Sequence, residues 1–192
     1  MTLTPLDAPR VRLRRFTRAD LPAFVAYRAD PEVARYQSWD SFTEADGEAF
    51  LAKQLGLDPG VPGTWFQFAV EAKDTGALLG DCALHVQADE PRIAEVGFTL
   101  AREHQGRGFG REAVERLLDF CFGQLKLHRV IAVVDCENAA AVALLERVGM
   151  RREGHFLENV WFKGRWGDEY LYALLAREWR ERPHRNASRD PW

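Results

Sequence analysis

Cysteine is scarce in this sequence of 192 residues. The three cysteines, Cys82, Cys121 and Cys136, are odd in number and far apart, and no C-x-x-C pair occurs. Neither a disulfide framework nor a zinc ribbon is therefore supported. Each cysteine lies in an apolar run, so we expect a reduced, buried thiol at each position. The five histidines show no metal-ligand spacing, and we expect no metal site.

The sequence also lacks a long apolar run and an excess of positive charge. No stretch is long enough to span a bilayer, and the N-terminal residues MTLTPLDAPRVRLRRF contain no apolar signal core. The net charge of -3 argues against nucleic acid as the main partner. We therefore expect a cytoplasmic protein with neither a membrane nor a nucleic-acid partner.

What the sequence contains is a regular succession of strand and helix patterns. Alternating or continuous apolar residues indicate strands at 10–16, 65–72, 77–86, 93–100 and 128–135, and a C-terminal pair within 152–175. Helical spacing follows Thr17 and Thr43, which are suitable N-caps. A third helix follows a glycine-rich stretch, and a fourth lies between Asn138 and Gly149.

Strands and helices alternate in the centre of the chain, and antiparallel hairpins flank them. This order predicts one α/β domain of the α+β type, with a mixed, mostly antiparallel sheet of six to seven strands and helices on both faces. We expect the domain to occupy residues 1–180 and residues 181–192 to form a polar tail. The segment from Arg177 onward is polar, so little ordered structure is expected after the last strand.

Three glycines, Gly106, Gly108 and Gly110, stand at alternate positions directly before the third helix. A helix N-terminus exposes unpaired N–H groups and a partial positive charge, and glycines let a phosphate approach them without meeting a Cβ. A Walker loop would need Lys-Ser/Thr where Arg111 and Glu112 stand, and a dinucleotide fingerprint would need glycine at Arg111. The glycines alone fit either a phosphate cradle or a turn that binds nothing.

Residues 105–110 also match the signature Q/R-x-x-G-x-G/A, and here the chain resembles the GNAT superfamily of acetyl-coenzyme A-dependent N-acyltransferases. The resemblance covers nearly the whole sequence. RVRLRRFTRADLPAFVAYRADPEVARY looks like the start of the branch that contains the ribosomal-protein alanine N-acetyltransferases. AEVGFTLAREHQGRGFGREAV, HRVIAVVDCENAAAVALLERVGM and GDEYLYALL then look like that branch's later motifs, in the expected order.

The resemblance implies a sheet that splays open between its fourth and fifth strands. The pantetheine arm of acetyl-coenzyme A would pair with the free edge of the fourth strand, as a substitute strand, and its pyrophosphate would lie on the amides of the glycine loop. Asn138 would contact the arm, serve as an N-cap, or do both. The implied coenzyme-binding residues are Phe98, Thr99, Leu100, Gln105, Gly106, Arg107, Gly108, Phe109, Gly110, Arg111, Asn138 and Leu144.

The same resemblance implies direct transfer of the acetyl group to a primary amine in a ternary complex. Glu95 is the candidate base, acting directly or through water; the alternative is an ordinary solvated or paired glutamate. Leu145 and Ala141 stand where many relatives carry a tyrosine and a serine, so the proton donor is unassigned. Water could supply the proton, or a residue of the last hairpin such as Glu158 or Tyr170.

The missing donors leave a second function open, that of a non-catalytic sensor or assembly module that binds acyl-coenzyme A. For the enzyme, the acceptor is expected to be a protein N-terminal amine or a small amine. Trp39, Trp161 and Trp166 are candidates for the wall of an acceptor pocket. A homodimer is expected as an option, because dimers are common among the relatives.

Overall fold

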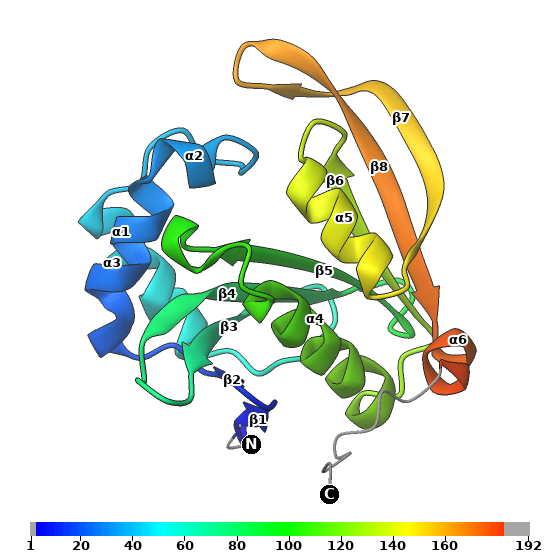
Figure 1. The fold of residues 1–192 in the computed structure, drawn as a ribbon, viewed down its shortest axis with the longest axis horizontal. Coiled ribbons are helices and arrows are strands. Elements are labelled where there is room, and N and C mark those ends of the chain that lie inside the picture. The colour runs from blue at the N-terminus through cyan, green and yellow to red at the C-terminus, as the bar shows by residue number, and fades with distance from the viewer. Residues whose placement is uncertain (1–2, 183–192) are drawn as a thin grey trace, which may run out of the picture.

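A computed structural model of the chain describes residues 3–182 (Figure 1). The elements are, in order, β1 (Leu6–Asp7), β2 (Val11–Arg14), a 3-10 turn (Arg18–Asp20), α1 (Leu21–Ala29), α2 (Pro31–Ala34), α3 (Glu44–Gln54), β3 (Trp65–Ala72), β4 (Leu78–Val86), β5 (Ile93–Leu100), a second 3-10 turn (Arg102–His104), α4 (Phe109–Asp119), a π-helical turn (Phe120–Gln124), β6 (Arg129–Asp135), α5 (Ala139–Arg147), β7 (Arg151–Phe162), β8 (Arg165–Leu175) and α6 (Ala176–Glu181).

All the strands belong to one sheet of eight, in the order β1-β2-β3-β4-β5-β6-β8-β7. Every neighbouring pair is antiparallel except β5 with β6, which is parallel. The predicted mixed, mostly antiparallel sheet is therefore confirmed. The strand count exceeds the predicted six to seven because Leu6 and Asp7 form a short edge strand beside β2.

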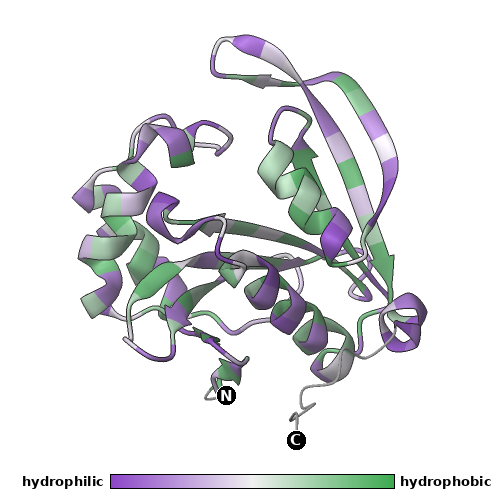
Figure 2. Cartoon of the chain, viewed as in Figure 1, coloured by the Kyte–Doolittle hydropathy of each residue, from purple (hydrophilic) through white to green (hydrophobic). Residues whose placement is uncertain are grey.

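Helices cover both faces of the sheet, as predicted. The main core lies under α4 and α5, where the predicted apolar face of α4 is buried against Leu84 and Val96 (Figure 2). A second core lies on the opposite face, where Phe24 of α1 and Leu51 of α3 pack against Ala69. Alternate strand residues enter the two cores, because side chains of a strand point to opposite faces in turn.

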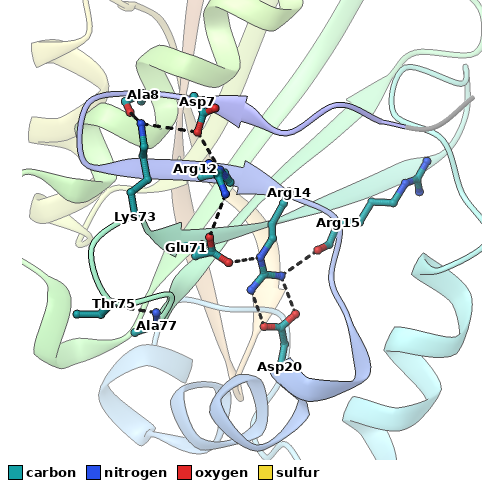
Figure 3. Close-up of polar contacts among 10 residues, drawn as sticks. All are labelled: Asp7, Ala8, Arg12, Arg14, Arg15, Asp20, Glu71, Lys73, Thr75 and Ala77. Atoms are coloured by element: carbon teal, nitrogen blue, oxygen red, sulfur yellow. Dashed lines mark hydrogen bonds and ion pairs between the residues drawn. The ribbon is translucent and has the colours of Figure 1, made fainter.

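The predicted N-caps are both present. Thr43 begins α3 with a capping box to Asp46, and Thr17 begins the 3-10 turn with a capping box to Asp20. Asp20 also accepts two hydrogen bonds from Arg14, each 2.8 Å long, and Arg14 donates at 2.5 Å to Glu71 (Figure 3). These bonds tie β2 to β3 and to the start of α1.

A buried charged cluster joins α1 to the middle of the sheet. Asp81 of β4 is 1% exposed and accepts hydrogen bonds from the Tyr27 hydroxyl, from Nη2 of Arg28 at 3.1 Å and from Nε2 of Gln67 at 2.8 Å. Because the carboxylate is surrounded by donors, its charge is compensated without water. The cluster fixes α1 against β3 and β4.

Arg28 completes this cluster from inside an aromatic cage. Its guanidinium carbon lies 4.2 Å from the ring centre of Trp39 and 4.5 Å from that of Phe24, with Phe42 and Phe50 slightly further away. Trp39 also donates its indole N–H to the Arg28 carbonyl at 2.9 Å. The loop after α2 is therefore anchored on α1, with Trp39 directed toward Arg28.

The end of the chain differs from the prediction. Residues 176–181 form α6 rather than an unstructured segment, with Glu178 accepting a hydrogen bond from the Leu175 N–H at 2.8 Å. Trp179 is buried at 6% exposure and donates to Asp119 at 2.9 Å. The prediction failed because the segment from Arg177 is mostly polar, whereas the buried Trp179 holds α6 to α4. The rest of the predicted tail, 183–192, lies outside the described residues.

We predict that Asp81→Ala lowers the free energy of unfolding by about 3–5 kcal/mol, because the Arg28 charge would stay buried without its carboxylate. Chemical denaturation of the ligand-free protein measures this. Asp7→Ala is the matched control: Asp7 pairs with Arg12 at 2.8 Å, but its side chain is 53% exposed, so we expect a far smaller loss of stability than in Asp81→Ala. Equal losses in the two variants would contradict the role given to the cluster.

Candidate active site

β5 and β6 are neighbours for only part of their lengths. Their parallel pairing is limited to three residue pairs, from Ile93 with Arg129 to Glu95 with Ile131, although both strands continue further. On its other edge β5 stays paired with β4 as far as Leu100. The sheet therefore opens on the β6 side of residues 96–100, which confirms the predicted splay (Figure 1).

A cavity of about 280 Å³ lies in this opening. Ala132 and Val134 reach it from the face covered by α5, whereas Val133 and Asp135 reach it from the opposite face. Residues from both faces of the sheet therefore contribute to the cavity wall. On the second side, residues 36–38 and Phe162 of β7 complete its wall.

The loop from β5 to α4 contains the three glycines in two different roles. Gly106 and Gly108 have φ values of 71° and 85°, a conformation that residues with a Cβ disfavour. Gly110 has ordinary helical geometry, but a Cβ there would lie 2.8 Å from Cδ1 of Leu100 and 3.0 Å from Cδ1 of Leu144. Gly110 is thus required by the packing of α4, and only the first two glycines shape the loop.

Arginines surround this loop. The guanidinium groups of Arg10 and Arg107 lie 4.8 Å and 5.1 Å from the ring centre of Phe109, the first residue of α4. Arg10 also donates to the Arg107 carbonyl at 3.2 Å and pairs with Glu112 at 2.9 Å. Arg111 pairs with Glu115 one turn further along the helix, at 2.9 Å. The sequence did not single out Arg10, because this residue directly precedes β2 and is far from the glycine loop along the chain.

The other predicted coenzyme residues lie along the opening. Phe98 and Asn138 line the cavity. Gln105 donates from its side chain to the Leu100 carbonyl at 3.0 Å and so holds the start of the loop against β5. Thr99 is buried on the face that carries Asp81, its partner in register on β4, and it is not among the residues that line the cavity.

Asn138 is an N-cap in this structure. Its side chain accepts a hydrogen bond from the Ala141 N–H at 3.1 Å at the start of α5. Because the same residue lines the cavity, the capping role and a contact with a bound coenzyme are compatible.

Glu95 lies at the point where β5 and β6 part. It is half-buried on the face that carries Gly97, one of the cavity residues. Burial raises the pKa of its carboxyl above the ordinary value; the charge of His85, its neighbour on β4, opposes the rise, and the charge of Glu169 adds to it. A raised pKa suits a carboxylate that must exchange protons near neutral pH.

Two further carboxylates share that face, and the sequence did not indicate them. Asp135 of β6 and Glu169 of β8 are in register with each other and both line the cavity. Neither forms an ion pair within the part of the chain that the structure describes, whereas Asp20, Asp81, Glu71 and many other carboxylates do. Only the fold brings Glu95, Asp135 and Glu169 to one face, since they lie on three different strands, β5, β6 and β8.

The two positions without a proton donor lie at the cavity. Ala141 and Leu145 of α5 both line the cavity, and both are apolar. Of the alternatives, Glu158 lies in an exposed bulge of β7 and Tyr170 bonds to the Cys136 side chain. Neither belongs to the cavity wall, where the hydroxyl-bearing residues are Tyr36 and Ser38.

Other predicted site features lie elsewhere. Trp161 and Trp166 meet edge to face with ring centres 5.5 Å apart and are 61% and 54% exposed. Neither they nor Trp39 are among the residues that line the cavity, so their role in an acceptor pocket stays a prediction. Their neighbour Phe162 lines the cavity instead, because alternate residues of a strand face opposite sides. Burial raises the pKa of the Cys82 thiol, which makes it unreactive.

Comparison with known proteins agrees with this geometry. A sequence model of the acetyltransferase (GNAT) domain matches residues 10–151. The chain belongs to the GNAT acetyltransferase family. It is an acetyl-coenzyme A-dependent N-acetyltransferase, as this family membership and its relatives show.

Two curated relatives show the range of this family. The chain is 32% identical over 174 residues to the uncharacterized N-acetyltransferase p20 of Bacillus licheniformis, which covers 91% of this chain and 97% of the relative. It is 27% identical over 118 residues to the ribosomal protein uS5 alanine N-acetyltransferase of Escherichia coli, covering 61% of each. The predicted likeness to the ribosomal-protein branch is thus confirmed as a relationship, without fixing the acceptor.

A solved structure gives the same arrangement of elements. The spermidine N-acetyltransferase of Vibrio cholerae in complex with CoA and spermine superimposes with a TM-score of 0.77 at 28% identity, over 89% of this chain and 98% of that one. In the described part of this GNAT acetyltransferase, no group of three or more His, Cys, Asp or Glu side chains could hold a metal ion. Within residues 3–182, no helix has the length and apolar character needed to cross a membrane.

The two roles of the glycines can be separated by measurement. We predict that Gly110→Ala lowers the free energy of unfolding by about 1–3 kcal/mol without any ligand, because the added methyl group overpacks Leu100 and Leu144. Gly123→Ala is the control, since Gly123 lies in the π-helical turn with open space around its Cα; it should be neutral or stabilising by about 0.5–1 kcal/mol. An unaltered stability of Gly110→Ala in thermal and chemical unfolding would show that this glycine is not a packing residue.

Proposed function

We propose that this enzyme transfers an acetyl group from acetyl-coenzyme A to a primary amine that enters the cavity from the face opposite α5. The observation that carries the proposal is the cavity itself, which lies in the parted sheet and has walls on both faces. The glycine loop follows β5 and leads into α4. Asp135 and Glu169 line the cavity on the face opposite α5, and Glu95 lies on that face two residues before the cavity residue Gly97. Two substrates can therefore meet within the sheet.

The residues of the opening fit the coenzyme. The unpaired edge of β5 beyond Glu95 offers N–H and C=O groups to an amide-rich arm, as a missing strand would. The start of α4 offers unpaired N–H groups and a partial positive charge to a pyrophosphate, with Arg107 and Arg10 beside it. Acetyl-coenzyme A supplies the acetyl group as a thioester, and the chain supplies its position.

Glu95 is proposed as the general base. An acceptor amine with a pKa of about 10 is protonated at neutral pH and must lose a proton before it can attack. The Glu95 carboxylate accepts that proton, directly or through a water molecule. A main-chain N–H at the unpaired edge of β5 stabilises the negative charge that develops on the acetyl oxygen.

The departing thiolate is proposed to take its proton from solvent. Ala141 and Leu145 present only carbon to the cavity, and the hydroxyl of Tyr36 donates to the Glu137 carbonyl at 3.2 Å. A thiolate with a pKa of about 8.5 is a stable enough leaving group for this route. The apolar wall would then exclude competing nucleophiles from the thioester.

The acceptor is proposed to be a cationic primary amine. Asp135 and Glu169 face the cavity without an ion pair among the described residues, so they attract a positively charged substrate. Relatives named as spermidine and ribosomal-protein alanine acetyltransferases act on a polyamine and on a protein amine, respectively. Both acceptor types match this wall, and a release assay for coenzyme thiol with polyamines, aminoglycosides and N-terminal peptides separates them.

That assay also tests the second function. A non-catalytic module would bind acetyl-coenzyme A in calorimetry and release no thiol with any amine of the panel. The absence of donors at Ala141 and Leu145 is the observation that favours this alternative. Binding without turnover would replace the enzymatic proposal, and absence of binding would remove both.

We predict that kcat/KM falls as the pH is lowered through the raised pKa of Glu95, because the protonated carboxyl cannot accept a proton. Glu95→Gln should slow turnover about 100-fold and abolish this acid limb while coenzyme affinity is retained. Glu169→Gln should move the limb slightly to lower pH, since burial still raises the Glu95 pKa but the added contribution of the Glu169 charge is removed.

The control is Glu48→Gln, an exposed glutamate of α3, which should leave the profile unchanged. The measurement is the pH dependence of kcat/KM for the wild type and the three variants, with the same acceptor amine throughout. If Glu95→Gln keeps the wild-type acid limb, Glu95 is not the base.

A further inference from the structure

The hairpin of β7 and β8 turns at an unusual pair of residues. Lys163 and Gly164 have φ values of 49° and 79°, and Phe162 pairs with Arg165 on either side of them. Two positive φ values in a two-residue loop are typical of a type I′ turn, whose first position favours asparagine, aspartate or glycine. Lysine is disfavoured there, because its Cβ crowds the backbone. A contact elsewhere must therefore hold this residue in place.

Lys163 makes that contact with α2. Its Nζ donates to the Ala34 carbonyl at 2.6 Å and lies 3.4 Å from Oδ1 of Asp40. Its side chain is only 25% exposed, whereas a lysine at a hairpin tip ordinarily extends into solvent. Ala34 ends α2, so the bond joins segments 129 residues apart in the sequence.

Both joined segments form the wall of the cavity. Val160 and Phe162 of the hairpin line it from one side, and Tyr36 and Ser38, just after α2, line it from the other. Figure 1 shows α2 and the hairpin on either side of the opening. Closing the gap between them encloses the end of the cavity that lies away from the glycine loop.

A second link joins the hairpin tip to the loop between β6 and α5 rather than to α2. Arg165 donates to both carboxylate oxygens of Glu137, at 2.8 Å and 2.6 Å. The two side chains are 57% and 49% exposed, and exposed ion pairs add little stability. Lys163 is therefore the contact that holds the hairpin tip to α2.

We propose that Lys163 is a positioning residue for the acceptor, and that its ammonium group latches the β7–β8 tip to α2. This inference rests on the proposed function, because it assigns the enclosed end of the cavity to the acceptor amine. With the latch closed, Phe162 and residues 36–38 enclose the acceptor near Glu95. With the latch broken, the two walls separate and the acceptor is held less tightly, while the glycine loop is unaffected.

The substitution Lys163→Asn removes the contact with Ala34 while keeping a residue that suits the turn. Asparagine is favoured at this turn position but is too short to reach Ala34, so the fold should be as stable as the wild type or more stable. We expect the acceptor KM to rise about tenfold, the value for a lost hydrogen bond to a charged group, with a smaller change in kcat. Coenzyme affinity in calorimetry should not change, and amide hydrogen exchange of residues 31–42 should accelerate.

Two further variants complete the design. Lys163→Arg keeps a cationic donor of sufficient length and should restore most of the wild-type KM. Lys126→Asn is the matched control, because Lys126 also has a positive φ of 55° and is exposed. It follows the π-helical turn after α4 and is not among the residues that line the cavity. It should change neither the acceptor KM nor exchange at residues 31–42.

The result that overturns the latch is unchanged hydrogen exchange of residues 31–42 in Lys163→Asn, whatever the kinetics. An unchanged acceptor KM with accelerated exchange would overturn its role in acceptor binding. If the wild type acetylates no amine, the proposed function fails on its own, and the exchange experiment still decides whether Lys163 holds the two segments together.

Discussion

β5 and β6 share three residue pairs and then separate, and the rest of the site depends on this divergence. A paired sheet leaves no room for a ligand between strands, because neighbouring strands lie only about 4.8 Å apart. Here the register ends at Glu95, so the last residues of β5 keep one unpaired edge and the first turn of α4 lies beside it. The unpaired edge of β5 and its position beside the start of α4 both suit a coenzyme, and both arise because the hydrogen bonding between β5 and β6 ends at Glu95.

The same divergence divides the chemistry between the faces of the sheet. On the α5 side the cavity wall is apolar, with Ala141, Leu145 and Val134. On the other side lie Glu95, Asp135 and Glu169; burial is the main cause of the raised pKa of Glu95, and the charge of Glu169 adds to it. Like charges in register weaken a sheet, so the pairing of Asp135 with Glu169 is tolerated at a cost in stability.

Most of the fold and half of the site follow from local sequence patterns. The strand and helix periods, the caps at Thr43 and Asn138 and the glycine loop are properties of neighbouring residues. Asp135, Glu169 and Arg10 could not be recognised in this way, because each acquires its neighbours only when distant strands assemble. α6 was missed for a related reason: its short polar sequence forms a helix through one buried side chain, Trp179.

Positive φ values occur both in the glycine loop and in the β7–β8 hairpin, but the chain accommodates them differently. Gly106 and Gly108 have no Cβ, so they adopt positive φ values at little cost in free energy. In the β7–β8 hairpin it keeps Glu158 and Lys163 at positive φ and compensates them with contacts: Asp168 accepts the Glu158 N–H at 2.8 Å, and Ala34 accepts Lys163. The bulge at Glu158 shifts the register between Phe156 and Val160, a device that redirects side chains in a strand. Val160 and Phe162 thereby reach the cavity, while Trp161 between them faces outward, so the strained residues of the hairpin are those that shape one wall of the cavity.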